Sequence, residues 1–248
     1  MGVFDTPAPV FAWADAQVAV VVPPLGRLIL WGIVAALISM GLYRALSAQE
    51  RIRHTKIKLA QLRQRLESYD GDFAAAGPLI GGLLRTALQQ VGLVAWPAIL
   101  SSLPLLALIC WLSTAYGYAY PAPGMVPAIQ TMPPQLQAKW VEGTHDETVP
   151  DYRPPPRIVV AGRDQKIVAD ISLPAPVPVI HKWQWWNALI GNPVGYLPGD
   201  AAVDWIEVAL PDKEYLGFGP QWLRGWEVPF FISLIAVSIA VKVWWRID

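Results

Sequence analysis

Residues 41–72 read "GLYRALSAQERIRHTKIKLAQLRQRLESYDGD", and the interpretation of the whole chain starts from them. The stretch leaves an apolar run and passes at once into Lys and Arg residues at helical spacing. Its pattern predicts a cationic helix attached to the end of a membrane helix. From residue 44 to residue 85 the basic residues are Arg44, Arg51, Arg53, Lys56, Lys58, Arg63, Arg65 and Arg85, and the acidic ones are Glu50, Glu67, Asp70 and Asp72.

The composition indicates a membrane protein. Hydrophobic residues make up 54% of the 248 residues, 13 residues are Trp, and the mean hydropathy is +0.36. This is too apolar for an ordinary soluble domain. Cys110 is the single cysteine, so no disulfide can form within the chain. The N-terminal residues include aspartates but no Lys or Arg, whereas a cleavable signal begins with basic residues, so we expect them to belong to the mature protein.

Three segments are predicted to span a bilayer, which requires roughly 20 apolar residues. Pro97 and Pro104 lie within the second of them, where we expect a kink rather than a break. Residues 10–22 precede Pro23 and Pro24 and are expected to lie along the outer interface as an apolar lead-in. The predicted spans are residues 28–43, 91–118 and 228–245.

The excess of Lys and Arg in cytoplasmic loops determines the expected orientation. Residues 44–90 are expected in the cytoplasm as a basic coiled-coil hairpin. Residues 1–27 and 119–226 are then expected outside, and the C-terminus, with Lys242 and Arg246, inside. This is the arrangement of a multi-pass protein of the bacterial inner (cytoplasmic) membrane.

The outgoing arm of the predicted hairpin has an apolar and a cationic face. Ile52, Leu59 and Leu66 recur every seven residues, with Leu62 between them. The cationic face consists of Arg51, Arg53, Lys56, Lys58, Arg63 and Arg65. The return arm has an apolar spacing of its own, at Leu79, Leu83, Leu84 and Leu88. Its glycines and one proline weaken any helix there; they are Gly77, Pro78, Gly81 and Gly82.

Residues 119–226 have a different character and are expected to form a small β-domain, most simply a sandwich. The prolines of "YPAPGMVPAIQTMPP" (residues 120–134) favour extended backbone. The predicted fold is therefore an α-helical membrane protein with an inserted extracytoplasmic β-sandwich-like domain. Strand-like segments lie at residues 157–162, 166–173, 177–186 and 202–210.

Three tryptophans, Trp183, Trp185 and Trp186, lie within "HKWQWWNALIGNP" (residues 181–193) and are costly to expose together. They belong either to a core or membrane-facing rim, or to a docking surface for another protein, because aromatic anchors dominate protein binding. The sequence leaves both alternatives open.

The sequence has no motif for nucleophilic, phosphate-binding, zinc-protease, redox or haem chemistry. We therefore expect no enzymatic activity, no cofactor and no metal, and an enzyme on a membrane anchor is the least favoured function. His145, Asp146 and Glu147 are adjacent but lack the spacing of a metal site, so we interpret them as surface polar residues.

One family resemblance follows from residues 43–72. They combine an arginine that ends the first membrane helix, a short step containing a glutamine, and a long basic hairpin, in "YRALSAQERIRHTKIKLAQLRQRLESYDGD". This combination resembles the YidC/Oxa insertase superfamily, nearest to the three-helix archaeal YidC-like proteins and the third subunit of the ER membrane protein complex. The resemblance covers residues 10–116. It implies that Arg44 faces a hydrophilic groove for inserting segments, that Gln49 matches the family glutamine, and that the hairpin recruits ribosome or nascent chain.

Two functions follow. In the first, the chain is a non-enzymatic protein that assists the insertion or assembly of other membrane proteins. In the second, it is a structural accessory subunit of a larger respiratory or photosynthetic complex. The partners are membrane lipids and other membrane proteins, and no DNA is expected. Arg27 and Arg44 have a simpler alternative role, which is to extend to the lipid headgroups from the two ends of the first span.

Overall fold

The computed structural model describes residues 2–71, 76–143, 154–162 and 164–246. The chain divides into two compact units. The mixed unit comprises Met1–Leu28 and Ala107–Val228, and the helical unit comprises Ile29–Leu106 and Pro229–Asp248.

Among the described residues, three helices are long and apolar enough to cross a membrane, as predicted. They are α2 (Pro24–Leu46), α4 (Gly77–Tyr116) and α5 (Glu227–Trp245), and α3 (Gln49–Glu67) follows α2 almost directly. α2 is longer than the expected segment 28–43. Pro24 can occupy the first helical position, because a backbone N–H at that position forms no hydrogen bond within the helix, so proline costs none.

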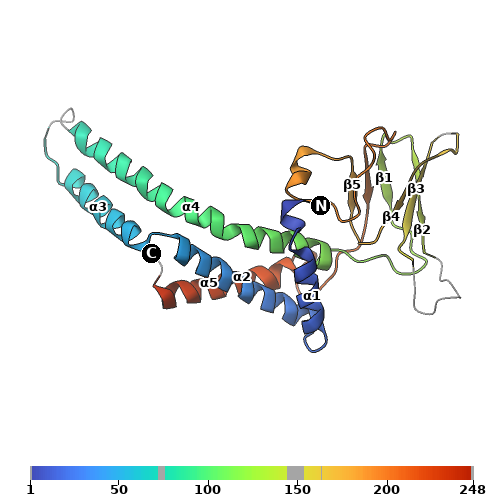
Figure 1. The fold of residues 1–248 in the computed structure, drawn as a ribbon, viewed down its shortest axis with the longest axis horizontal. Coiled ribbons are helices and arrows are strands. Elements are labelled where there is room, and N and C mark those ends of the chain that lie inside the picture. The colour runs from blue at the N-terminus through green and yellow to red at the C-terminus, as the bar shows by residue number, and fades with distance from the viewer. Residues whose placement is uncertain (1, 72–75, 144–153, 163, 247–248) are drawn as a thin grey trace. The chain divides into compact units, whose positions relative to one another are not determined.

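α4 passes through the expected boundary at residue 90 without a break. The prediction separated a hairpin arm ending at residue 90 from a span over residues 91–118, yet α4 is one helix of 40 residues (Figure 1). At 1.5 Å per residue, it is about 60 Å long. A helical glycine costs roughly 1 kcal/mol relative to alanine, and extending an existing helix is easier than starting one. The glycines therefore do not interrupt it, nor do Pro97 and Pro104.

α2 and α5 run parallel and in register. Near their N-terminal ends, Gly32 of α2 packs against Phe230 and Ser233 of α5. Near their C-terminal ends, the guanidinium of Arg44 lies over the ring of Trp245. Gly32 and Arg44 are 12 residues apart, and so are Ser233 and Trp245. The two helices therefore begin at one side of the helical unit and end together at the other.

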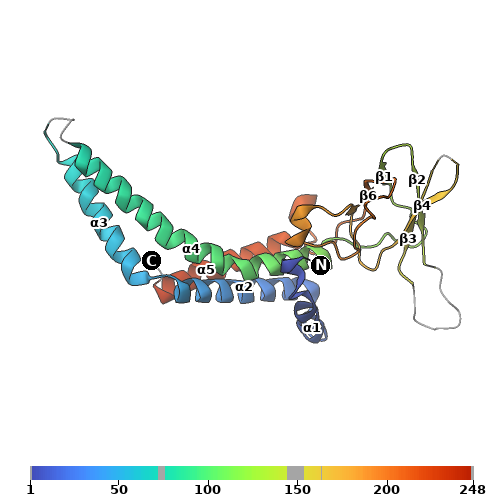
Figure 2. The ribbon, with the colours of Figure 1, turned by 45° about the horizontal axis from the view of Figure 1, so that its top comes forward.

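α3 lies beside the first half of α4 in both views of the ribbon (Figures 1 and 2). Ile52 is fully buried, and the other stripe residues of α3 are half-buried, which confirms the predicted apolar stripe. These residues are Leu59, Leu62 and Leu66.

The apolar positions of the return arm were predicted only in part. Leu79 and Leu83 are half-buried, but Leu84 and Leu88 are exposed. Successive residues of a helix point about 100° apart, so Leu83 and Leu84 cannot both face the same neighbour. The structure turns Leu84 and Leu88 outward.

The N-terminal part of the mixed unit is helical. A short helix, η1 (Val3–Asp5), precedes α1 (Ala8–Ala19), and the chain then turns before Pro24 starts α2. The expected apolar lead-in over residues 10–22 is therefore largely α1. Val10 and Trp13 are exposed on it.

The mixed unit also contains two small antiparallel sheets, which confirms a small β-domain. Their strand orders are β1-β6-β5 and β2-β3-β4. In the first sheet, Ile206 of β6 pairs with Thr131 of β1 on one side and Ile180 of β5 on the other. The strands are β1 (Ile129–Met132), β2 (Gln137–Val141), β3 (Arg157–Ala161), β4 (Ile167–Ser172), β5 (Val179–His181) and β6 (Trp205–Val208).

The four predicted strands are present but shorter, and two strands were missed. β1 lies within the proline-rich segment, where the sequence predicted only extended backbone, and β2 lies just after it, where no strand was predicted. The predicted strand at residues 177–186 ends at His181, because a short helix, η3 (Trp185–Ala188), follows.

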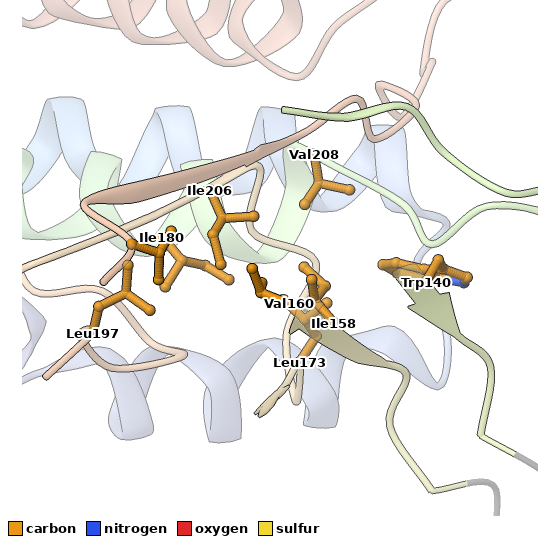
Figure 3. Packing of buried hydrophobic residues seen from close by; sticks show 9 residues of the cluster. Trp140, Ile158, Val160, Leu173, Ile180, Leu197, Ile206 and Val208 are labelled. Carbon is orange, nitrogen blue, oxygen red and sulfur yellow. The ribbon is translucent and has the colours of Figure 1, made fainter. Parts of the chain in front are cut away.

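Buried side chains from both sheets form one hydrophobic cluster (Figure 3). Ile158 and Val160 of β3 contribute from one sheet, and Ile206 and Val208 of β6 from the other. Each of these four side chains is at most 1% exposed. The two sheets are therefore stabilised by a shared core.

Candidate functional site

Arg44 lies in the last turn of α2 and is exposed. Its guanidinium carbon is 5.5 Å from the ring centre of Trp245 in α5. A cation over an aromatic face at this distance is attracted by the ring. Arg44 thus joins the C-terminal ends of two candidate spans while its charge stays accessible.

Gln49 begins α3, five residues after Arg44. Its side-chain amide donates a hydrogen bond to the Ser47 hydroxyl, and Ser47 is buried. Its backbone N–H also donates to the carbonyl oxygen of Ser47, at 2.9 Å. Arg44 and Gln49 therefore flank the short joint between α2 and α3, and Gln49 helps to fix that joint.

The six predicted cationic residues of α3 are all exposed. The apolar stripe of α3 is turned away from solvent, so the helix presents these charges on its outer surface. Such a surface attracts anionic lipid headgroups or RNA through charge alone. The residues are Arg51, Arg53, Lys56, Lys58, Arg63 and Arg65.

The return arm of the hairpin presents an exposed apolar stripe, of which the sequence analysis named Leu84 and Leu88 as apolar positions without predicting their exposure. Ile80, Leu84, Leu88 and Val91 follow at intervals of four, four and three residues and are 40–63% exposed. A shallow hollow beside the stripe is lined by Gly81, Leu84, Arg85, Leu88 and Gln89. Exposed apolar stripes of this kind typically mark a binding surface. The hairpin therefore combines a cationic surface on α3 with an apolar one on α4.

Polar atoms inside the helical unit form a further feature of its helices. Ser39 Oγ on α2 and Gln90 Oε1 on α4 are buried and have no hydrogen-bond partner among the described residues. Thr86 and Ser101 of α4 are also buried, but their hydroxyls donate to carbonyl oxygens of their own helix. Buried polar atoms without a partner are rare and call for a water or another polar group.

A charged cluster in the mixed unit joins segments far apart in the chain. The carboxylate of Asp15 in α1 forms an ion pair with Arg27 of α2 and accepts a hydrogen bond of 2.5 Å from the Tyr116 hydroxyl at the end of α4. Arg27 also lies 5.5 Å from the ring centre of Tyr116. The side chains of Arg27 and Asp15 are only 16% and 13% exposed. Arg27 thus has a protein partner, which disfavours the simpler alternative that its side chain extends to the lipid headgroups.

The segment after the sheets binds the end of the same helix. The Tyr215 hydroxyl donates to the carbonyl oxygen of Tyr116 at 3.0 Å, and Lys213 Nζ donates to that of Ala115 at 2.8 Å. Burial raises the pKa of Tyr215 to about 12, with a further increase from the Asp15 and Glu227 carboxylates and an opposing effect of Arg27. Burial lowers the pKa of Lys213.

The raised pKa of Tyr215 predicts a loss of stability at alkaline pH. An unfolded tyrosine ionises near pH 10, whereas folded Tyr215 keeps its proton until about pH 12. Between these two pH values the unfolded chain binds fewer protons than the folded one. The contribution of Tyr215 to the free energy of unfolding is therefore fully present below pH 10 and is lost as the pH rises to about 12. Tyr215→Phe should lower the neutral-pH stability by about 1 kcal/mol and flatten this alkaline decline in thermal melts. Tyr69→Phe, at an exposed position of the hairpin, should leave the decline unchanged.

The three candidate tryptophans are exposed, which excludes their assignment to a core. Trp183, Trp185 and Trp186 are 57%, 72% and 47% exposed. The buried Asn187 side chain holds this loop, since its Oδ1 accepts from the Gln184 N–H at 2.7 Å and its Nδ2 donates to the Ile190 carbonyl at 3.2 Å. A membrane-facing rim and a protein docking surface remain as alternatives.

No group of three or more His, Cys, Asp or Glu side chains that could hold a metal ion occurs among the described residues. His145, Asp146 and Glu147 lie outside the described residues. No protein-family model, no curated protein and no solved structure matches this chain. The resemblance to the YidC/Oxa superfamily therefore stays a hypothesis that rests on the motifs of the chain itself.

Proposed function

We propose that this chain is a non-enzymatic membrane protein that assists the insertion or assembly of other membrane proteins, in the manner of the insertase superfamily. It would reside in the bacterial inner membrane. Residues 1–27 and the β-domain, with its two sheets packed as a sandwich, would lie outside, and the hairpin and C-terminus in the cytoplasm. The parallel course of α2 and α5 supports this orientation, because it places Arg44, Lys242 and Arg246 at the same side, as the excess of cytoplasmic positive charge requires.

The observation that carries the proposal is the pair of surfaces on the hairpin. A nascent membrane segment is apolar, and the RNA of a ribosome and the headgroups of many bacterial lipids are anionic. The exposed apolar stripe on α4 suits a nascent membrane segment, and the cationic surface of α3 suits ribosomal RNA and anionic lipid headgroups. α4 continues from the stripe into a candidate span, so a segment held there would already lie beside the membrane-crossing part.

Arg44 is the second element of the proposal. A cation close to the membrane, with unpartnered polar atoms such as Ser39 Oγ in the helix above it, lowers the cost of moving polar or acidic groups into the bilayer. Gln49 would maintain the joint that positions the hairpin relative to Arg44.

We predict that Arg44→Ala reduces the inserted fraction of short single-span client proteins several-fold, whereas Arg44→Lys retains most of it. The measurement is protease protection of newly made clients in membranes that carry each variant as the sole copy. Arg224→Ala removes a cation from an exposed pair with Glu214 in the mixed unit and serves as the matched control. Full insertion with Arg44→Ala at normal protein level would refute the proposed role of this residue.

A structural accessory subunit is the second candidate, and it would use the exposed Trp183, Trp185 and Trp186 as its docking surface. Purification from the native membrane in mild detergent, followed by mass spectrometry, separates the two functions. Ribosomal proteins and many substoichiometric membrane proteins support insertion, whereas a single complex of fixed stoichiometry supports a resident subunit.

A further inference from the structure

The loop that contains the exposed tryptophans is bound to the N-terminal segment. Residues 183–196 are here named the Trp loop. The Phe4 N–H of the N-terminal segment donates a hydrogen bond to the Leu189 carbonyl oxygen at 2.9 Å. In the other direction, the Gly191 N–H of the loop donates to the Asp5 side chain, at Oδ2, at 2.6 Å. A side chain at Gly2 would lie within 2.7 Å of backbone atoms of Leu189 and Gly191. The Trp loop, η1 and the start of α1 therefore form one structural element.

Two adjoining cavities locate this element along α4. They have volumes of about 290 and 390 Å³ and share Asp5, Cys110, Thr114, Asn192 and Pro193 in their walls. Cys110 and Thr114 belong to the last two turns of α4, which ends at Tyr116. The ring of Phe11 in α1 also lies 5.8 Å from that of Trp111. The Trp loop and α1 thus lie at the level where a candidate membrane span ends.

The element offers almost no free charge. Residues 183–196 contain no Asp, Glu, Lys, Arg or His, and residues 2–22 contain only Asp5 and Asp15. Asp5 accepts from two backbone N–H groups, and Asp15 pairs with Arg27. The side chains of Asn187 and Asn192 bond within their own segment or to Val179.

Its exposed surface is instead apolar and aromatic. Besides the three tryptophans, Leu189 and Ile190 of the Trp loop are 47% and 50% exposed, and Val20 and Val21 after α1 are both 84% exposed. Tryptophan is enriched where a protein meets the boundary between lipid headgroups and acyl chains. A protein interface would instead usually include polar and charged groups at its rim.

We propose that the Trp loop and α1 together insert into the headgroup region of the leaflet in which α4 ends. The occupant of this surface is lipid. Trp185 and Trp186 are its aromatic anchors, and the N-terminal segment holds the loop at the correct depth. This inference requires that α4 crosses the membrane but is independent of any role in insertion.

The test uses the full-length protein in vesicles of phosphatidylcholine and phosphatidylglycerol. In a Cys110→Ala background, single cysteines at Trp185, Leu189 or Val21 carry the fluorophore NBD, and Ile167→Cys is the control. Ile167 is an exposed residue of β4, with 62% exposure. Nitroxide lipids quench NBD inside the leaflet, and iodide quenches it in water.

We expect labels at positions 185, 189 and 21 to be quenched by nitroxide lipids and protected from iodide, and the label at position 167 to show the reverse. Three sites guard against a variant that does not fold. Iodide quenching at all three sites as strong as at position 167 would overturn the proposal. Protection from both quenchers would also overturn it, because it would show that protein, such as a second copy of this chain, covers the surface.

Discussion

Asp15→Ala is expected to destabilise the folded protein by about 3 kcal/mol, the usual consequence of removing one partner from a buried ion pair. The Asp15 carboxylate forms an ion pair with the Arg27 guanidinium and accepts a hydrogen bond from the Tyr116 hydroxyl. Without the carboxylate, Arg27 keeps its charge in a position that is only 16% exposed. Its Nε already has no hydrogen-bond partner among the described residues.

The measurement is thermal or denaturant unfolding of the full-length protein in a nonionic detergent, since an anionic headgroup could take the place of Asp15. Glu214→Ala is the matched control, because the pair of Glu214 with Arg224 is 47% and 36% exposed. Exposed pairs contribute about 1 kcal/mol or less. Asp15→Ala with no larger effect than Glu214→Ala would show that the cluster does not hold α1.

A double-mutant cycle distinguishes an ion pair from general packing. Arg27→Leu alone removes the cation that pairs with the Asp15 carboxylate, whereas Asp15→Leu with Arg27→Leu removes both charges. The double variant should therefore be more stable than the sum of the two single losses predicts. Simple additivity would mean that the two side chains contribute separately.

The helices were the part of the fold that the sequence predicted well, since apolar length is a local property. The outward face of α3 could also be predicted, because Ile52, Leu59 and Leu66 have one consistent spacing that marks the opposite, inward face. On α4, consecutive leucines such as Leu83 and Leu84 left the facing side undefined, and only packing decided it. The exposure of Leu84 and Leu88 on the hairpin was not predicted for this reason.

The charged cluster could be foreseen only in part. Asp15 and Arg27 both lie in apolar segments, where a charge requires a partner, and a turn at Pro23 and Pro24 could bring them together. Tyr116, 101 residues from Asp15, gives no local signal of its role. Strand β1 was missed for the same reason, because its partner is distant in the sequence. Ile129 pairs with Val208 of β6, and such long-range pairing overrides local preference.

Gly32→Ala is expected to destabilise the packing of α2 on α5 by about 1–3 kcal/mol, as overpacked contacts do. A Cβ atom at Gly32 would lie 2.7 Å from the carbonyl oxygen of Phe230 and would overlap the Ser233 hydroxyl. The hydroxyl can rotate, but the carbonyl belongs to the backbone of α5, so the two helices must separate. Small residues permit such close approach between membrane helices.

Gly92→Ala is the matched control, because Gly92 lies within α4 and a Cβ there meets no atom within 4 Å. It should be neutral or stabilise the protein by up to about 1 kcal/mol, since alanine is the better helix former. The same substitution should therefore lower the melting temperature at Gly32 and leave it unchanged or raise it at Gly92, as measured in detergent. Ser233→Gly should restore only part of the loss, because the Phe230 carbonyl stays in place. Equal effects at Gly32 and Gly92 would refute the close contact, and with it the register that aligns Arg44 with Trp245.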